Sequence, residues 1–203
     1  MLRLLLATRN PHKTREFAEM LGAGCEIRDL TKMAHVPMVE ETGATFEENA
    51  ILKAVLVSRL VTDFVVADDS GLEVAALDGA PGVYSARFAG ENASDRQNLA
   101  KLLEDLLAME SNDDRRARFR CVLAVASRGD VLGTFHGEVA GKIIKTPRGE
   151  NGFGYDPVFV PEGYDRTFAE LGAAVKNQIS HRAMAIHQLQ QQIIRGLQPR
   201  LPD

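Results

Sequence analysis

The chain has 203 residues and a net charge of −4, and 45% of its residues are hydrophobic. That length allows one ordinary domain with a buried core, and the negative charge argues against a protein that coats nucleic acid. No apolar run approaches the roughly 18 residues that span a bilayer, and the apolar start over residues 1–7 lacks a signal-peptide cleavage pattern. We therefore expect a cytoplasmic protein without a nucleic-acid or membrane partner.

In the first third of the chain, two strand-like apolar segments are separated by two segments with helix-capping residues at their starts. Asparagine and threonine are favoured at helix N-caps, and proline is favoured at the first helical position. The elements expected from these signals are a strand over residues 2–7, a helix from the Asn10 cap to Gly22, a helix from a Thr45/Glu48 capping box to about residue 60, and a strand over 63–67.

The rest of the chain repeats this alternation, with a hairpin in the middle. The expected elements are a helix capped by Ser94 and Gln97, a strand over 119–127, a returning strand over 131–135, a possible third strand over 139–144, a glycine- and proline-rich segment over 147–163, a capped turn at 167–171, and a final helix from Ser180 to about residue 194. Helices that both follow and interrupt strands predict a mixed α/β sheet flanked by helices.

Two adjacent carboxylates and a hydroxyl follow the apolar run at residues 64–67. Asp68, Asp69 and Ser70 are expected at the end of that strand. Mg²⁺ prefers oxygen ligands and usually takes one or two carboxylates together with substrate phosphates. The segment therefore suggests a cation site, although acidic residues after a strand are more often turn formers.

The turn over residues 8–13 joins the first strand to the first helix. A helix N-terminus presents free N–H groups and partial positive charge, both of which favour phosphate. Lys13 in the first helical turn would add a full charge. The alternative is a plain capped turn with a solvated lysine.

Four glutamates lie between residues 40 and 48, where the simple interpretation is a solvated surface. Glu48 is expected to be used in the helix cap, whereas Glu40 and Glu41 in the preceding loop are available to a cation. Lys53 falls on the following helix, and by default it would be exposed.

Two later segments are also unusual. Gly152 and Gly154 allow close backbone approach to a ligand, and the aromatic residues beside them offer a surface for a planar base. The alternative is a glycine- and proline-rich loop without a binding role. Residues 176–182 place Lys176, His181 and Arg182 around a helix start, where positive charge opposes the helix dipole. Together the segments suggest a Mg²⁺-dependent enzyme that handles a nucleotide.

Six segments of the chain resemble the inosine/xanthosine triphosphate pyrophosphatase family. They occur in the family's order and span about residues 4–189. Arg9 stands where the family often has a small or polar residue, which leaves the role of that side chain open. The segments are Thr8-x-Asn10-x-x-Lys13, and residues 41–50, 67–72, 79–87, 152–157 and 176–183.

The resemblance implies a Mg²⁺-dependent hydrolase that converts ITP, dITP, XTP and dXTP to the monophosphate and pyrophosphate, which keeps these nucleotides out of DNA and RNA. It also implies a homodimer. The implied fold is an elongated mixed α/β domain over residues 1–203, with two lobes and the active site between them.

The resemblance assigns residue roles as well. Asp69 is the implied catalytic base and, with Glu41, holds Mg²⁺; Asp68 and Glu40 rank lower as ligands. Arg182 is expected to donate to the 6-oxo group of the purine. The implied substrate-binding residues are Thr8, Arg9, Asn10, Pro11, His12, Lys13, Lys53, Ser70, Phe153, Gly154, Tyr155, Asp156, Lys176, His181 and Arg182.

Three alternative functions remain open, and they differ from this one in substrate, in turnover or in product. A related pyrophosphatase would act on modified pyrimidine or other altered nucleotides. A nucleotide-binding regulator would bind without turnover. A phosphatase with an aspartyl nucleophile would release orthophosphate, and it usually needs an Asp-x-Asp spacing near the N-terminus that this sequence lacks.

Overall fold

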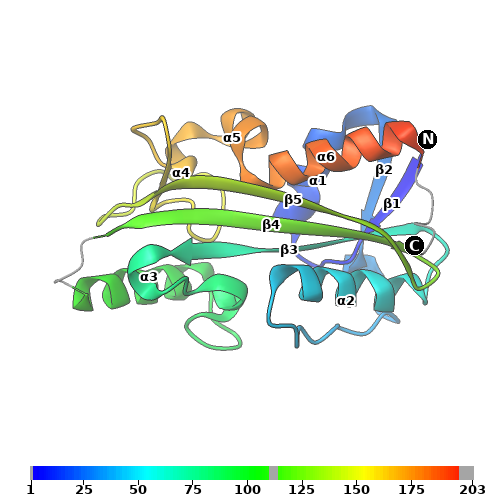
Figure 1. Cartoon of the computed structure of the whole chain (residues 1–203), viewed down its shortest axis with the longest axis horizontal. Coiled ribbons are helices and arrows are strands. Elements are labelled where there is room, and N and C mark those ends of the chain that lie inside the picture. The colour runs from blue at the N-terminus through cyan, green and yellow to red at the C-terminus, as the bar shows by residue number, and fades with distance from the viewer. Residues whose placement is uncertain (1, 110–113, 197–203) are drawn as a thin grey trace. The chain divides into compact units, whose positions relative to one another are not determined.

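A computed structural model describes residues 2–109 and 114–196 of the chain. Their helices and strands in chain order are β1 (Leu2–Leu6), α1 (Pro11–Leu21), β2 (Cys25–Asp29), α2 (Phe46–Ser58), β3 (Phe64–Val74), α3 (Asp95–Ala108), β4 (Arg116–Ser127), β5 (Asp130–Ile143), β6 (Phe159–Pro161), α4 (Phe168–Leu171), α5 (Ala173–Ile179) and α6 (His181–Arg195) (Figure 1).

The strands form one sheet in the order β2-β1-β3-β4-β5-β6. β1 pairs in parallel with β2 and β3, whereas β5 and β6 pair antiparallel. The predicted mixed α/β fold is therefore confirmed. β1 is apolar apart from Arg3, and its last three leucines are almost fully buried, as expected for a strand covered on both faces.

The chain forms two compact units. Unit 1 comprises Met1–Asp69, Cys121–Gly137 and Arg182–Asp203, and unit 2 comprises Ser70–Arg120 and Glu138–His181. The single domain over residues 1–203, with an active site between two lobes, stays a prediction.

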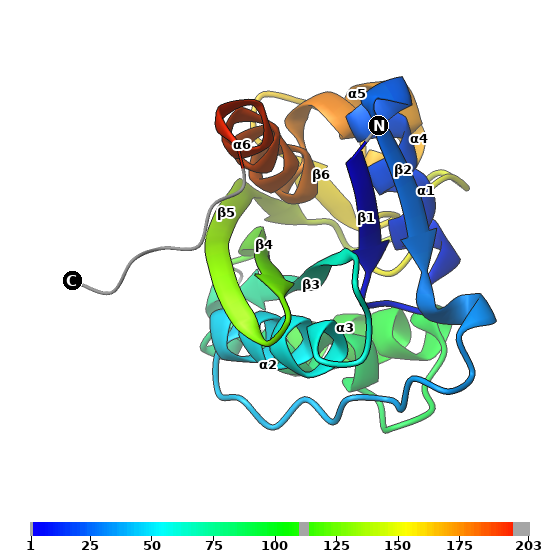
Figure 2. The same ribbon diagram turned by 90° about the vertical axis from the view of Figure 1, so that its right-hand side faces the viewer.

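In unit 1, helices cover the strands on both sides. α1 and α6 lie on one side and α2 lies on the other (Figures 1 and 2). On the α1 and α6 side, alternate strand residues such as Leu4, Leu6 and Val66 pack with Phe17 of α1 and Ile186 of α6. This packing follows from the strand period of two, which sends successive side chains to opposite faces.

Local sequence explains where α1 begins and ends. The Asn10 side chain accepts hydrogen bonds from the backbone N–H groups of His12 and Lys13, and Pro11 occupies the first helical position. Gly22 follows the helix with φ of 62°, a conformation that glycine adopts without steric cost. The predicted start and end of this helix are confirmed.

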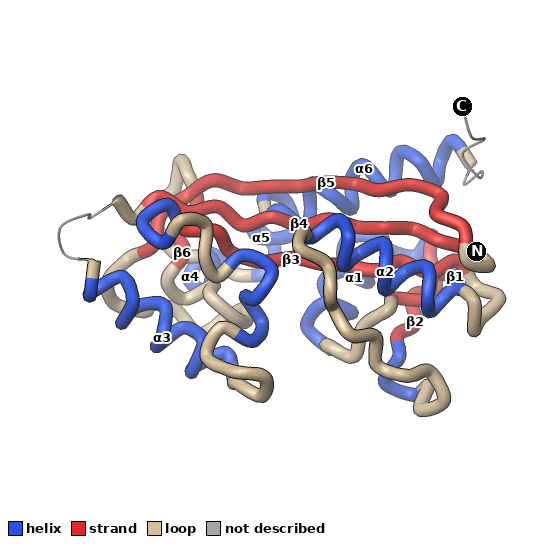
Figure 3. Tube along the Cα trace, turned by 60° about the horizontal axis from the view of Figure 1, so that its bottom comes forward, coloured by secondary structure: helices blue, strands red, loops and turns tan. Residues whose placement is uncertain are grey.

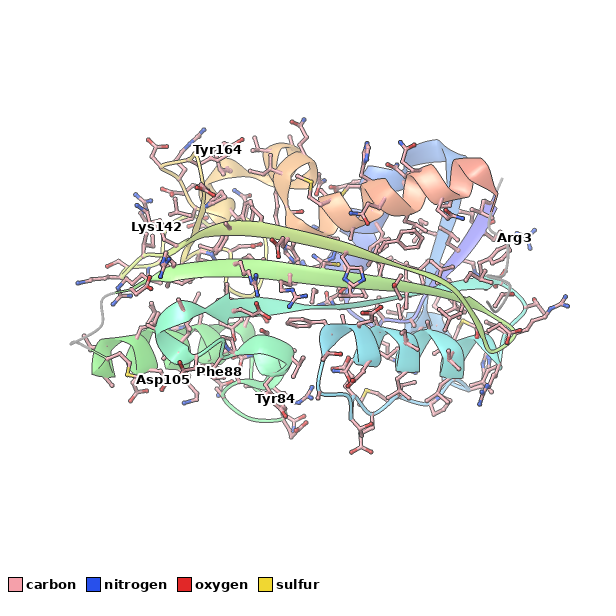
Figure 4. The ribbon with its side chains drawn as sticks, in the orientation of Figure 1. Arg3, Tyr84, Phe88, Asp105, Lys142 and Tyr164 are labelled. Atoms are coloured by element: carbon pink, nitrogen blue, oxygen red, sulfur yellow. The ribbon has the colours of Figure 1, made fainter. Side chains whose placement is uncertain are left out.

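Unit 2 has its own apolar core, which includes Leu72, Leu102, Phe119, Phe159 and Phe168. The capping box predicted at the start of α3 is present, because the Ser94 and Gln97 side chains each bond to the other's backbone. Lys101 of α3 pairs with Asp105, and its ammonium lies 5.0 Å from the ring centre of Phe88; Phe88 and Asp105 are labelled in Figure 4.

Two expectations about the elements were wrong, and two elements were missed. β3 does not end at Ala67 but runs through Asp68 and Asp69 to Val74. The segments expected as two strands over 131–135 and 139–144 form the single strand β5. β2 and α5 were not predicted. The final helix was predicted from Ser180 to about residue 194, and α6 begins directly after Ser180, which also ends α5. No described helix has the length and apolar character needed to cross a membrane.

Candidate functional site

Asp68 and Asp69 lie inside β3, where their side chains point to opposite faces of the strand. Asp68 contacts Lys13 of α1 and Arg182 of α6. Asp69 contacts Lys53 of α2 on the other side. Two neighbouring carboxylates, which looked like one cation site in the sequence, therefore belong to two separate groups of charges.

On the Asp69 side, the Lys53 ammonium is shared between two carboxylates. Its Nζ lies 3.0 Å from Asp69 Oδ1 and 2.6 Å from Glu41 Oε1. These two oxygens therefore lie within two hydrogen-bond lengths of each other. Lys53 is 7% exposed and Asp69 is 5% exposed, so the helix residue that by default would be solvated is instead buried among charges.

Glu41 is held in place by its loop rather than by a regular element. Residues 33–45 form a long irregular connection that leads into α2 (Figure 3). This loop is fastened to α2 by two bonds: Gly43 N–H donates to Asn49 Oδ1 at 2.7 Å, and Ala44 N–H donates to Glu48 Oε2 at 2.7 Å. A Cβ at position 43 would lie 2.7 Å from Asn49 Oδ1, so the close approach requires glycine. Glu40, by contrast, is exposed.

The Asp69 side has the donor chemistry that Mg²⁺ needs. Asp69 Oδ2 is buried and has no hydrogen-bond partner within the described residues. Leaving a buried carboxylate oxygen unpaired is costly, and a cation is one way to satisfy it. Among the residues that the structure describes, no group of three or more histidine, cysteine or acidic side chains is suited to holding a metal ion. Two carboxylates nevertheless suffice for Mg²⁺ when phosphate oxygens complete its shell.

The environment raises the pKa of Asp69. Burial is the largest cause, and the nearby Glu41 carboxylate adds to it, while the Lys53 ammonium acts in the opposite direction. The pKa of Lys53 is also raised, because its two carboxylate neighbours outweigh the effect of burial. A carboxylate that holds a proton more readily than usual, beside a permanent cation, is suited to accepting a proton from water.

On the opposite face, Asp68 is the centre of a buried ionic group. Its Oδ1 lies 2.5 Å from Lys13 Nζ, and its Oδ2 accepts from Arg182 Nε at 2.7 Å. Arg182 Nη1 in turn donates to Glu16 Oε2 at 2.6 Å, and the Cys121 thiol donates to Asp68 Oδ2 at 3.4 Å. Burial opposes ionisation of Asp68, but Arg182 and Lys13 outweigh it and hold the pKa well below its usual value.

The backbone of Asp68 brings the two lysines together. β1 ends at Leu6, and Ala7 N–H then donates to Val66 O. The carbonyl of Asp68 is the next on that edge of β3, and it accepts from Lys53 Nζ at 2.9 Å and from Lys13 Nζ at 3.3 Å. Two ammonium groups that converge on one carbonyl create a local positive field suited to a polyphosphate.

The turn over residues 8–13 lies at the end of β1 and is well ordered by its own side chains. Thr8 Oγ1 accepts from Asn10 N–H at 3.1 Å, in addition to the helix cap that Asn10 provides. Arg9, whose role was left open, donates from Nη2 to Val36 O at 2.6 Å and so joins the turn to the loop that carries Glu41. His12 is exposed in the first turn of α1.

Unit 2 contains the second group of predicted residues. Asp156 and Lys176 form an ion pair of 2.5 Å, and both side chains are almost fully buried. Asp156 Oδ2 also accepts from Phe153 N–H at 2.9 Å, and the Lys176 ammonium lies 4.6 Å from the Phe153 ring centre. Asp156 thus shapes the loop that presents the partly exposed Phe153 and positions a cation beside its ring.

The other predicted residues of unit 2 are mostly structural neighbours of this loop. Tyr155 is buried, and its hydroxyl donates to Ser85 O at 2.9 Å. His181 stacks on Phe119 with ring centres 4.7 Å apart. Gly154 N–H donates to Asp95 Oδ2 at 2.7 Å. Ser70 is partly exposed on β3. The substrate-binding roles of these residues stay predictions.

We expect Gly152→Ala to destabilise the protein more than Gly163→Ala. Both glycines have similar positive φ, 78° and 82°, so both substitutions carry the backbone cost, about 1 kcal/mol. Only at position 152 would the new Cβ collide, 2.0 Å from Asp156 Oδ2. Gly163 has open space around it.

Chemical denaturation of the two variants measures the difference directly. The extra loss expected for Gly152→Ala is about 1–3 kcal/mol. Equal losses in the two variants would show that the Asp156 side chain does not constrain position 152.

Three residues of these groups were not found from the sequence. Glu16 lies one helical turn after Lys13, and that i, i+3 spacing was a usable signal. Asp95 was visible only as an acidic residue in the first turn of α3. Cys121 sits in an apolar strand, and nothing local indicates its contact with a carboxylate.

Comparison with known proteins identifies relatives along nearly the whole chain. The model of the Ham1 family matches residues 4–192. A protein of Bacillus licheniformis named dITP/XTP pyrophosphatase is 50% identical over 190 residues, which cover 93% of this chain and 96% of the relative. One from Desulfotalea psychrophila with the same name is 46% identical, covering 98% and 90%.

Two solved structures are also similar. A HAM1 protein from Coxiella burnetii superposes with a TM-score of 0.86 at 42% identity, covering 97% of this chain and all of that one. The Ham1 protein of Staphylococcus aureus gives a TM-score of 0.82 at 43% identity, with the same coverage. The similarity to these two structures covers the architecture of nearly the whole chain.

Proposed function

This chain belongs to the Ham1 family, and we propose that it hydrolyses the non-standard purine nucleotides ITP, dITP, XTP and dXTP to the monophosphate and pyrophosphate. Such an activity removes deaminated purines from the nucleotide pool before they enter DNA or RNA. The relatives' printed names, dITP/XTP pyrophosphatase, support this choice of substrate.

One observation carries the proposal. In unit 1, the ammonium groups of Lys13 and Lys53 meet at the carbonyl of Asp68, and the paired carboxylates of Asp69 and Glu41 lie beside them. These cations lie next to two carboxylates, and the buried one, Asp69, has an oxygen with no hydrogen-bond partner among the described residues. Such an arrangement suits a polyphosphate that arrives with a divalent cation.

The proposed reaction is the attack of a water molecule on the α-phosphorus. A new P–O bond forms, the bond between the α-phosphorus and its bridging oxygen breaks, and pyrophosphate leaves. Asp69 accepts the proton of the water, a task for which its raised pKa suits it. Lys53 and Lys13 neutralise the negative charge that grows on the departing pyrophosphate, which is the main requirement in phosphoryl transfer.

Mg²⁺ belongs to the proposal, with Glu41 and Asp69 as its protein ligands; when bound, it would neutralise phosphate charge and make water more acidic. We further propose, from the family resemblance, that the protein is a cytoplasmic homodimer. Removal of the metal with a chelator is expected to stop hydrolysis. Analytical ultracentrifugation, which measures the mass of the protein in solution, is expected to give the mass of a dimer.

Base selection has a simple physical basis in this proposal. Hypoxanthine and xanthine present a 6-oxo acceptor, whereas adenine presents an amino donor at that position. A buried site that donates to the oxo group leaves its own groups unpaired when adenine binds, and such sites discriminate by about 10⁴–10⁵. Arg182 stays the predicted donor, while Phe153 offers a ring to the base.

The test is a substrate panel in which pyrophosphate and orthophosphate are measured separately. We expect ITP, XTP and dITP to yield pyrophosphate with Mg²⁺ present, and ATP and GTP to react far more slowly. Orthophosphate as the first product would indicate an aspartyl phosphatase. Preference for an altered pyrimidine would place the protein among related pyrophosphatases, and binding without turnover would make it a regulator.

A further inference from the structure

The two groups around Asp68 and Asp69 share a strand but differ in what their carboxylates contact. Asp69 keeps one buried oxygen that has no hydrogen bond from any described residue. Both oxygens of Asp68, by contrast, are engaged: Oδ1 by Lys13 and Arg182, and Oδ2 by Arg182 and the Cys121 thiol. A carboxylate surrounded by three donors has little capacity left for a metal ion.

The Asp68 group is balanced in charge and deeply buried. Glu16, Arg182 and Lys13 join it to form two positive and two negative side chains in an unbroken chain of contacts. Arg182 is 1% exposed and Asp68 is 6% exposed. Such a network holds its members in one geometry, because any displaced charge would be left buried without a partner.

Lys13 is the member of the network that reaches toward solvent. Its side chain is 16% exposed, against 4% for that of Asp68. An ammonium group has three N–H donors. Within the described residues, two of them are accounted for, by Asp68 Oδ1 and by Asp68 O. The lysine is thus held at its tip with a donor left to offer to an anion.

We propose that Asp68 is a positioning residue, which holds the Lys13 ammonium ready for the phosphates of the substrate and takes no part in metal binding. Arg182, Glu16 and the Cys121 thiol fix the carboxylate that does this. A free lysine loses rotamer entropy when it binds phosphate; one already held by Asp68 has lost it on folding. This inference rests on the proposed function, because it takes Lys13 as a phosphate ligand.

A double-mutant cycle tests whether Asp68 acts through Lys13. The variants are Asp68→Asn, Lys13→Met and the pair, and the probe is the α,β-imido analogue of ITP, whose α–β bond cannot be hydrolysed. Its Kd is measured by calorimetry with Mg²⁺ present. Asp68→Asn is expected to weaken binding roughly tenfold in the presence of Lys13 but less than about twofold in the Lys13→Met background.

Two further readouts separate positioning from other roles. The Mg²⁺ concentration that gives half-maximal ITP hydrolysis should be unchanged in Asp68→Asn, whereas a metal ligand would shift it upward. Cys121→Ala keeps every charge and removes only the thiol donor, so it serves where Asp68→Asn fails to fold. It should weaken analogue binding about two- to fivefold, and only when Lys13 is present.

The inference would be overturned if Asp68→Asn weakened analogue binding equally with Lys13 and with Lys13→Met. A raised Mg²⁺ requirement in Asp68→Asn would also overturn it. Wild-type protein that does not hydrolyse ITP at all would instead contradict the proposed function, so the two failures are distinguishable. Coupled losses with an unchanged Mg²⁺ requirement would establish Asp68 as the residue that positions Lys13.

Discussion

Asp69→Asn is expected to lower kcat for ITP by about 10²–10⁴-fold, the usual contribution of a general base. The amide retains the shape of the side chain but cannot accept the proton of the attacking water. It is also a poorer ligand for a divalent cation, which places the expected loss toward the upper end of this range. Steady-state release of pyrophosphate measures the effect.

The same substitution should not destabilise the protein. Because the pKa of Asp69 is raised on folding, its ionised form opposes folding at pH values above the folded pKa, and this penalty disappears below the unfolded pKa. At pH 7, with a chelator present, the free energy of unfolding of Asp69→Asn should therefore equal or exceed that of the wild type. Near pH 3 this advantage should vanish.

Glu104→Gln is the matched control, since Glu104 is an exposed carboxylate on α3. It should change neither kcat nor stability. Near-normal turnover by a well-folded Asp69→Asn variant would remove Asp69 from the mechanism.

Arg182→Met should lower the free energy of unfolding by about 3–5 kcal/mol, the cost of breaking a buried ion pair from one side. The substitution keeps an apolar stem of similar length but leaves two buried carboxylates, Glu16 and Asp68, without their shared guanidinium. The pKa of Asp68 would rise toward its usual value or above. Urea denaturation at pH 7 measures the loss.

The loss of stability caused by Arg182→Met should become smaller at acidic pH. Asp68 has a depressed pKa in the folded protein, so its contribution is present above the unfolded pKa and is lost as the pH falls through the folded pKa. The difference between wild type and Arg182→Met is therefore expected to narrow below about pH 4.

Arg118→Met provides the comparison with a surface pair. Arg118 Nε lies 2.6 Å from Glu73 Oε2, as close as the buried pair, but its side chain is 49% exposed. Exposed pairs contribute about 0–1 kcal/mol. If Arg182→Met costs no more than Arg118→Met, the buried network does not stabilise the fold.

Local signals predicted the helices with well-defined caps. Asn10 and Ser94 cap α1 and α3 as expected, because side-chain capping depends on residues only two or three positions apart. β2 was missed because its alternation of apolar and polar residues is only five residues long, and α5 because its polar residues resemble a loop. The pairing of β2 with β1 is what makes it a strand.

At the candidate site, too, local sequence indicated the residues but not their arrangement in space. Residue types and spacing, read with the family resemblance, suggested which side chains take part, and the structure gathers Lys13, Lys53, Glu41 and Asp69 within unit 1. The separation of Asp68 from Asp69 could not be predicted, because it depends on β3 continuing past Ala67. Apolar residues end at that point, so a strand signal based on hydrophobicity ends there too.

Hydrolysis of ITP in ¹⁸O-labelled water tests most directly the claim that water attacks the α-phosphorus beside Asp69. Mass spectrometry of the products locates the oxygen. We predict one labelled oxygen in IMP and none in pyrophosphate. Label in the pyrophosphate would mean that water attacks the β-phosphorus, which would contradict the mechanism.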